Sequence, residues 1–299
     1  MKYTHIILTS FALTVFAHAQ LPDTPSAGTT IRTWTNTDGV EIEASLLEAK
    51  ETSVLLKLSN GRTYAVPFEK LSPQDIEWVE GRAAAESAAA QSAMGLAFAP
   101  LLATTGEVLF EDDLSEIREG WGAGNGEWKN VEGALVGKEL AEDNHGATFK
   151  RALPLTEAVI QFSFKLDGAK ATTFSIDNAT GHLCRLSISA AGFTAQKDDN
   201  DKDLGPDTGA RYNTVERELA DGEWHTAMLE LVGDTFLAQI DGEGEEVSLG
   251  SHEMIAGEKK KLGFTISGES VHYKDLRVWA ANPSDGWEDT RDSLLKDSD

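Results

Sequence analysis

The stretch DNATGHLCRLSIS, residues 177–189, contains the only cysteine of the chain, with a histidine and an arginine close to it. A thiol beside His182 and Arg185 is typical of a cysteine nucleophile, because a cationic, partly exposed setting stabilises the reactive thiolate. Strand alternation favours another interpretation, since Cys184 then shares a face with Leu186 while Arg185 projects to the opposite face. A free cysteine among apolar neighbours behaves as a small hydrophobic residue. We therefore predict that Cys184 belongs to the core.

The opposite face of this strand carries polar side chains that suit a sugar. The runs 159–166 and 172–177 alternate in the same way, so three neighbouring strands would form one polar sheet surface. Curvature turns such a surface into a groove, where charged side chains hold sugar hydroxyls by directed hydrogen bonds. The predicted sugar-binding residues on this surface or at its mouth are Gln161, Lys165, Ser175, His182, Arg185 and His145. An ordinary solvated sheet face would show the same alternation.

Glycoside hydrolysis would require two carboxyl groups on one groove. Asp177 is the one acid on the predicted polar surface, and Glu230 comes from a later strand. We predict Asp177 or Glu230 as the acid/base of any hydrolysis, with Lys165 and Arg185 holding the sugar.

A second group of carboxylates lies in the acidic loop KDDNDKDLGPDTGARYN. Asp199, Asp201 and Asp203 are spaced as in calcium-binding loops, in which alternate carboxylates turn toward one cation. The loop departs from the EF-hand pattern, because Leu204 stands where glycine is required and Ala210 where the bidentate glutamate belongs. A solvated acidic loop is the alternative. Calcium is the one metal that the sequence suggests, and no cofactor fingerprint is present.

Charge and the first residues limit the partners and the location. The chain of 299 residues has a formal net charge of −24, which disfavours nucleic acid and anionic membrane surfaces as partners. Residues 1–19 have a basic start, a short apolar run and an Ala-x-Ala ending, typical of a cleaved signal peptide. We expect a secreted, periplasmic or cell-envelope protein, without membrane insertion after cleavage.

Elements of two all-β domains must position these residues. The segment 31–80 contains four β-rich runs, Asp-Gly and Asn-Gly hairpin turns and a short capped helix, a pattern typical of an SH3-like barrel. Repeated two-residue alternation over 107–281 predicts an antiparallel jelly-roll sandwich. The remaining predicted segments are a disordered leader over 20–30, an alanine-rich, semi-helical linker over 81–106 and a polar tail over 282–299 that forms a short helix.

The first domain resembles the SLA1 homology domain 1 family. The resemblance is carried by an R-x-W-T-x-x-x-G opening at residues 32–39 and a V-P-x-x-x-L-S-x-x-D ending at residues 66–75. It implies a small module that binds a protein partner through residues 31–80, or a spacer. For Trp34, Pro67, Phe68 and Leu71 we favour core packing over a binding role.

The second domain resembles the 3-keto-disaccharide hydrolase family, known as DUF1080, with its concanavalin-like, LamG-type jelly roll. The resemblance is carried by GEWKNVEGALVG, by DGEWHTAMLELVGDTFLAQIDGE and by the closing VHYKDLRVWAA. It implies carbohydrate contact and hydrolysis of glycosides oxidised at the third carbon. The family's N-S-G-x-x-x-R strand is replaced by FSIDNATGHLCRL, which leaves Arg185 as a loose counterpart. The alternative is a non-catalytic envelope scaffold or adaptor that acts through the SH3-like domain.

Overall fold

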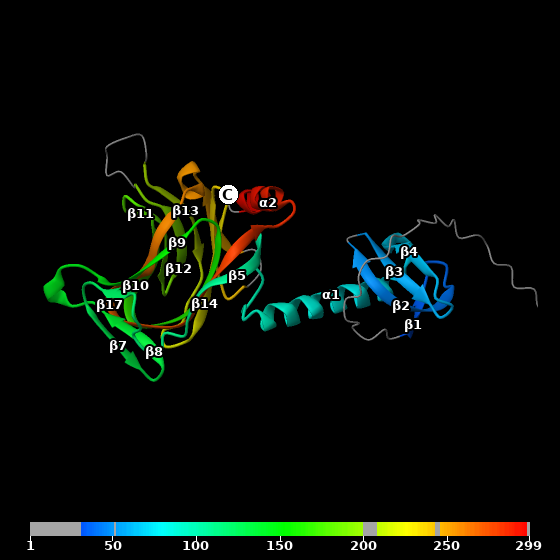
Figure 1. Cartoon of the computed structure of the whole chain (residues 1–299), viewed down its shortest axis with the longest axis horizontal. Helices are drawn as coiled ribbons and strands as arrows, with labels where there is room; N and C mark the ends of the chain where they lie inside the picture. The colour runs from blue at the N-terminus through cyan, green and yellow to red at the C-terminus, as the bar shows by residue number, and fades with distance from the viewer. Residues whose placement is uncertain (1–30, 51, 200–207, 243–245, 298–299) are drawn as a thin grey trace, which may run out of the picture. The chain divides into compact units, whose positions relative to one another are not determined.

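The computed structural model describes residues 31–297 except 51, 200–207 and 243–245, and it describes no side chains within 84–93. The chain divides into two compact units, Met1–Glu86 and Ser87–Asp299, and Figure 1 shows their elements. The predicted signal peptide and leader lie outside the described residues. Within the described ranges, no helix combines the length and the apolar character needed to cross a membrane.

Four antiparallel strands form the first unit, in the order β1-β2-β3-β4. The elements are β1 (Ile31–Thr35), β2 (Glu41–Lys50), β3 (Ser53–Leu58), β4 (Thr63–Pro67), the 3-10 helix η1 (Phe68–Lys70) and helix α1 (Pro73–Ala93). Both predicted hairpin turns are present, since Gly39 and Gly61 adopt left-handed conformations with φ of 77° and 83°. The Asn36 side chain closes the first turn by accepting hydrogen bonds from the amides of Asp38 and Val40.

Trp34 lies at the centre of the first unit's core and is 1% exposed. Its indole Nε1 donates to the Ala44 carbonyl at 3.0 Å, and its ring meets the Trp78 ring edge-on at a centroid distance of 5.6 Å. Leu71, from the V-P-x-x-x-L-S ending, packs in the same cluster. These motif residues therefore form the interior of the unit.

Asp75 ties helix α1 to strand β1. Its carboxylate accepts hydrogen bonds from Arg32 Nη2, from the Thr35 amide at 2.7 Å and from the Ser72 hydroxyl at 3.0 Å. The Arg32 guanidinium also lies over the Trp78 ring, 4.1 Å from its centroid. The two ends of the motif, far apart in sequence, thus meet in one buried network.

Helix α1 differs from the sequence expectation of a short helix followed by a separate linker over 81–106. The structure joins the two into one helix of 21 residues. Alanine has the highest helix propensity, so the alanine-rich run extends the helix that begins at Pro73. The helix ends at Ala93, and Gly95 follows with φ of 75°.

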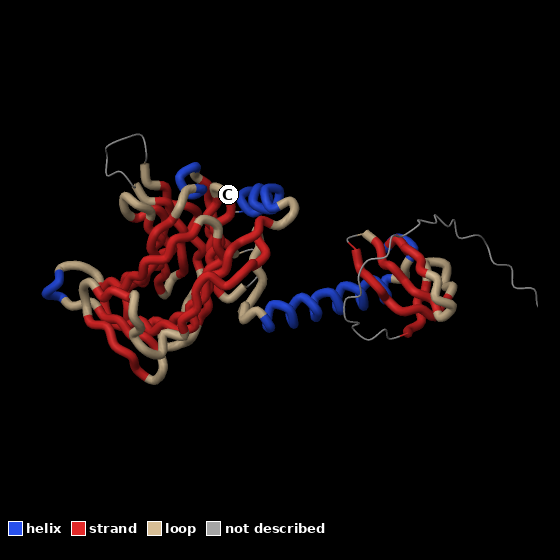
Figure 2. The backbone as a smooth tube through the Cα atoms, viewed as in Figure 1, coloured by secondary structure: helices blue, strands red, loops and turns tan. Residues whose placement is uncertain are grey.

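Strands make up most of the regular structure of the second unit, as the tube in Figure 2 shows. Its strands are β5 (Ala103–Asp112), β6 (Trp121–Ala123), β7 (Glu127–Val131), β8 (Ala134–Lys138), β9 (Ala147–Leu155), β10 (Ala158–Asp177), β11 (His182–Ser189), β12 (Gly192–Lys197), β13 (Ala210–Glu216), β14 (His225–Val232), β15 (Thr235–Ile240), β16 (Val247–Ser251) and β17 (Lys259–Pro283). Its helices are the 3-10 helices η2 (Ala141–Asp143) and η3 (Glu253–Ala256) and helix α2 (Trp287–Asp297). All strand pairs are antiparallel, so the predicted all-β class is confirmed.

Two long strands, β10 and β17, bend and run through both layers of a sandwich. Phe162 and Phe174, twelve positions apart on β10, stack with ring centroids 4.9 Å apart, whereas a straight strand would separate them by about 40 Å. The pairing register is irregular between residues 167 and 171, and Gly168 has φ of 74°. Strand β17 bends at Gly268, with φ of 92°.

The bends divide the sheet into two layers. Layer A contains β16, β15, β14, residues 158–166 of β10, residues 271–283 of β17 and β5. Layer B contains β13, β12, β11, residues 171–177 of β10, residues 259–267 of β17, β9 and β6. The main hydrophobic core lies between them.

Cys184 lies in this core and is fully buried, as strand parity predicts. A bulge places Leu183 in the core as well, because Asp177 pairs with His182 while Ile176 pairs with Cys184. Burial raises the pKa of the Cys184 thiol far above its ordinary value, which suppresses the thiolate.

We expect Cys184 to resist thiol reagents in the folded protein. Labelling with a chromogenic disulfide reagent should be at least about 100-fold slower in buffer than in denaturant, because neither access nor thiolate is available in the fold. Rapid labelling without denaturant would contradict the core placement.

The outer face of layer A is covered by residues 94–102, which we call the strap, and by helix α2. Leu96 and Leu102 of the strap and Leu294 of α2 pack with Val159 and Trp279 in a second apolar cluster. The short helix expected in the polar tail is present as α2, and both this helix and part of the predicted linker are packed elements of the second unit.

Candidate functional site

The bend in β10 separates residues that the sequence places on one surface. Gln161 and Lys165 lie on the half of β10 in layer A, whereas Ser175 and Asp177 lie on the half in layer B. Alternation within each half is as predicted, but the fold-back directs the two outer faces to opposite sides of the sandwich. The expectation of one continuous polar surface is therefore wrong.

A group of polar side chains covers the outer side of layer B, and we call it the polar face. Its members are Lys150 on β9, Ser175 and Asp177 on β10, His182 and Arg185 on β11, Gln196 on β12 and Asp198 just after β12. The register places Ser175 opposite Arg185, and Arg185 opposite Gln196. Four predicted site residues (Ser175, Asp177, His182 and Arg185) thus lie on one face.

Asp177 is the centre of one ion-pair network on the polar face. Lys150 Nζ donates to its Oδ2 at 2.8 Å, and His182 Nδ1 lies 2.7 Å from its Oδ1. Burial pushes the pKa of Asp177 upward, but the hydrogen bonds from His182 and Lys150 outweigh it and hold the pKa below its ordinary value. Asp177 is therefore ionised at neutral pH.

Arg185 is the centre of the second network. Its Nε and Nη2 donate to the two carboxylate oxygens of Asp198, with Nε at 2.7 Å from Oδ2. Gln196 Nε2 donates to the same carboxylate at 2.9 Å. Such a two-pronged pair fixes the plane of the guanidinium.

This chemistry suits binding better than proton donation. A glycosidase needs one carboxyl group that is protonated at working pH to act as the general acid. Asp177 is held ionised by Lys150 and His182, so it accepts hydrogen bonds and carries no proton for a leaving group.

Glu230 lies in layer A, away from the polar face, and its side chain is 0% exposed. Its carboxylate accepts hydrogen bonds from the amides of Leu101, Leu102 and Ala103 at 2.7, 2.8 and 3.0 Å. The predicted catalytic role of Glu230 does not fit this position, because the strap covers the carboxylate. Glu230 holds the strap on layer A.

Gln161 likewise binds the strap. Its Oε1 accepts from the Ala97 amide at 2.8 Å and its Nε2 donates to the Gly95 carbonyl at 3.2 Å. Lys165 lies four positions further along β10, with Nζ 5.5 Å from the ring centroid of the exposed Trp224. Neither residue reaches the polar face.

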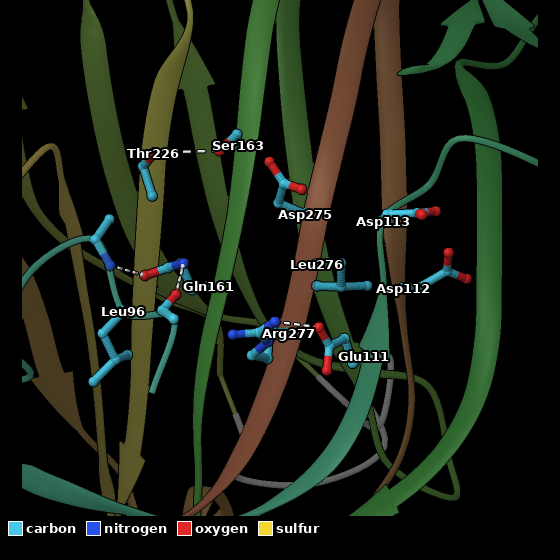
Figure 3. A pocket seen from close by; sticks show the side chains of 12 residues that line it. Leu96, Glu111, Asp112, Asp113, Gln161, Ser163, Thr226, Asp275, Leu276 and Arg277 are labelled. Carbon is cyan, nitrogen blue, oxygen red and sulfur yellow. Dashed lines mark hydrogen bonds and ion pairs between the residues drawn. The ribbon is translucent and has the colours of Figure 1, made fainter. Parts of the chain in front are cut away.

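A pocket of about 400 Å³ opens beside the strap on layer A (Figure 3). It is lined by residues of the strap, β10, β14 and β17, and by the carboxylates at 111–113. Most of its polar groups are already paired: Arg277 with Glu111, Ser163 with Thr226, and Gln161 with the strap. The pocket therefore offers fewer unpaired groups to a ligand than its polar lining suggests.

The predicted His145 lies apart from the polar face. It is exposed in the loop before β9, and its Nδ1 lies 2.8 Å from the Gly146 carbonyl. The first residue of β9, Ala147, pairs with Ile266 close to the bend of β17, whereas Lys150 pairs further along the strand with Gly263.

The proposed calcium loop falls mostly outside the described residues, because Asp201 and Asp203 belong to the segment 200–207. Asp199 is described and is half-buried. In the part of the chain that the structure describes, no group of three or more histidine, cysteine, aspartate or glutamate residues is placed to hold a metal.

Sequence reasoning missed three members of the polar face: Lys150, Gln196 and Asp198. Alternation in TFKRALPL and GFTAQKDD does indicate that Lys150 and Gln196 point outward, because each follows an inward residue, Phe149 and Ala195 respectively. Which strands are neighbours is not a local property, so these side chains could not be assigned to the surface of Asp177 and Arg185.

Comparison with known proteins gives matches for both units. The second unit's fold resembles the carbohydrate binding module CBM66 from Bacillus subtilis (12% identity, 54% of this chain and 96% of that chain, TM-score 0.44). It also resembles a galectin-like protein of unknown function from Bacillus subtilis (11% identity, 61% and 100%, TM-score 0.45) and the Bacillus licheniformis beta-glucanase (11% identity, 59% and 99%, TM-score 0.44). A search of curated proteins finds no match to the chain. Residues 23–87 match the family model of SLA1 homology domain 1, SHD1, so the first unit is similar to that domain.

Proposed function

We propose that the chain is an exported protein whose second unit recognises a carbohydrate through the polar face. The observation that carries this proposal is the pair of ion networks around Asp177 and Arg185, which fix charged side chains on adjacent strands. Charged groups held in place by one another give directed hydrogen bonds to sugar hydroxyls at little cost in side-chain entropy.

The paired charges of the two networks support a neutral ligand. Lys150 and Arg185 form ion pairs with Asp177 and Asp198, while two further exposed bases, Lys261 and Arg211, lie on the same face as cross-strand partners of Asp177 and Gln196. The chain as a whole has a net charge of −24. The net negative charge of the chain would repel a phosphate or sulfate. The bases of the polar face would repel a cation. Sugar hydroxyls both donate and accept, so they can use both signs of charge.

Recognition is favoured over hydrolysis. The resemblance to 3-keto-disaccharide hydrolases implies turnover, but of the two predicted acids Asp177 is held ionised and Glu230 is buried under the strap. We therefore propose a binding domain, with 3-keto-glycoside hydrolysis as the finer alternative.

The test is glycan binding by the full chain on an array of neutral oligosaccharides, followed by titration calorimetry. Arg185→Gln should weaken binding by at least about tenfold, because it removes charge-assisted hydrogen bonds. Lys150→Gln should do the same from the other network. Lys129→Gln, which removes a base whose side chain is over half exposed on β7, is the matched control and should leave the affinity unchanged.

Three other outcomes are informative. Binding that survives both polar-face variants would place the sugar elsewhere. Release of sugar from 3-keto-glycosides by the wild type but not by Asp177→Asn would establish hydrolysis. Absence of binding to every glycan on the array would favour the alternative, in which the SHD1-like first unit contacts a protein partner.

A further inference from the structure

A row of hydroxyl side chains crosses layer B from β9 to the edge strand β13. Its members, in spatial order, are Thr148 on β9, Thr265 on β17, Thr173 on β10, Ser187 on β11, Thr194 on β12 and Thr214 on β13. Each is the direct cross-strand partner of the next. Direct cross-strand partners project to the same side of a sheet, so all six hydroxyl residues share the polar face with Ser175 and Arg185. We call this set the hydroxyl row.

The hydroxyls in the middle of the row are available. Within the described ranges, the side chains of Thr265, Thr173 and Ser187 make no hydrogen bond, and all three are half-buried rather than covered. Those nearer the edges are engaged: Thr194 and Thr214 bond each other at 2.8 Å, and Thr148 Oγ1 accepts from a backbone amide. The centre of the row therefore offers three adjacent unpaired hydroxyl groups.

Charged residues run alongside the hydroxyl row. Ser175 and Arg185 each lie two positions along the strand from a row member, Thr173 and Ser187 respectively. Two positions correspond to about 7 Å along a strand. The polar face thus has two parallel lines across the strands: the hydroxyl row, and a second line with Lys150, Ser175, Arg185 and Gln196, which we call the charged line after its two bases.

We infer that the polar face binds an extended polysaccharide chain lying across the strands, along the hydroxyl row, rather than a single or terminal sugar. This inference rests on the proposed function and adds the length and direction of the ligand. Neighbouring strands are about 4.8 Å apart, so six strands span about 24 Å. In an extended chain, one pyranose ring and its glycosidic oxygen span a similar distance, so a row of about 24 Å matches about five units.

Cross-strand threonine pairs also stabilise sheets, so the test needs a readout that sheet stability does not change. We expect affinity to rise with ligand length. Titration of the full chain with cello-, laminari-, malto- and xylo-oligosaccharides of two to six units should show an increase of at least about 100-fold between two and five units in the series that binds, and then a plateau. Equal affinity for two and six units would overturn the inference and leave the proposed function intact.

Two variants separate the row from the charged line. Thr173→Val with Ser187→Ala keeps the shape of the face and should reduce the gain from two to five units to less than about tenfold, while the affinity for two units is retained. Arg185→Gln should weaken every length by a similar factor. Thr63→Val, an exposed threonine on β4 of the first unit, is the control.

The remaining outcomes decide between the two levels of the proposal. An unchanged length dependence in the Thr173→Val, Ser187→Ala protein would overturn the inference, even if Arg185→Gln abolishes binding. Loss of length dependence without any effect of Arg185→Gln would support the row and contradict the role of the charged residues. No binding of any oligosaccharide by the wild type would overturn both.

Discussion

Glu230→Ala is expected to destabilise the second unit by about 4 kcal/mol. The carboxylate is fully buried and accepts three backbone hydrogen bonds from residues 101–103. Removing it leaves three buried amides without an acceptor, each costing about 1–3 kcal/mol, and also opens a cavity. The strap should detach first, because Glu230 fixes its C-terminal end. Denaturant unfolding, with hydrogen exchange of residues 94–102 as the local readout, measures both effects.

Two matched variants test the cause. Glu107→Ala, at an exposed position of β5 next to the strap, should change stability by less than about 0.5 kcal/mol. Glu230→Gln keeps one acceptor oxygen but turns an amide group toward the backbone donors, so its effect should be intermediate. If Glu230→Ala is no worse than Glu107→Ala, the strap is not held by this carboxylate.

The same residue makes stability depend on pH in a defined direction. Burial, partly opposed by the three backbone hydrogen bonds, raises the pKa of Glu230 from 4.5 to about 7. Between these values the folded state keeps a proton that the unfolded chain has lost, so raising the pH favours unfolding. The stability that the folded state gains from holding this proton should therefore be fully present below pH 4.5. It should be lost as the pH rises through about 7. The difference in stability between the wild type and Glu230→Gln isolates it from other groups.

What could be predicted from the sequence was local. The inward position of Cys184 follows from alternation over a few residues, and the turns at Gly39 and Gly61 follow from their dipeptides. The alternation on each half of β10 was also correct. The bend at Gly168 was not predicted, and it alone decides that Gln161 and Asp177 face opposite sides.

Glu230 shows why the rest was inaccessible. Its neighbours on the same face of β14, Met228 and Val232, are apolar, which is a signal that this face is covered. No nearby residue indicates which segment covers this face, because the strap lies about 130 residues earlier in the sequence. The polar face could not be predicted for the same reason. Lys150 reaches Asp177, and Asp198 reaches Arg185, through strand pairings that no local sequence pattern encodes.

Stabilities of about 0.05–0.15 kcal/mol per residue are usual, so a unit of the size of residues 31–86 is stabilised by only a few kcal/mol. The network around Asp75 is a large part of that. The carboxylate is 3% exposed and accepts from Arg32, the Thr35 amide and the Ser72 hydroxyl. Arg32 Nη1 is already buried without a partner. Loss of Asp75 is therefore expected to remove most of the free energy of unfolding of the first unit.

Asp75→Ala is accordingly expected to unfold the first unit at room temperature while the second unit stays folded. It leaves the partly buried Arg32 charge unpaired and two further donors unsatisfied, a loss of about 3 kcal/mol or more. Hydrogen exchange resolved by peptide should show protection lost across β1–β4 and retained across β10–β17. Glu77→Ala, an exposed acid on the same helix, should leave both patterns unchanged. Retained protection of β1–β4 in Asp75→Ala would mean that Trp34 and its apolar neighbours suffice to keep the first unit folded.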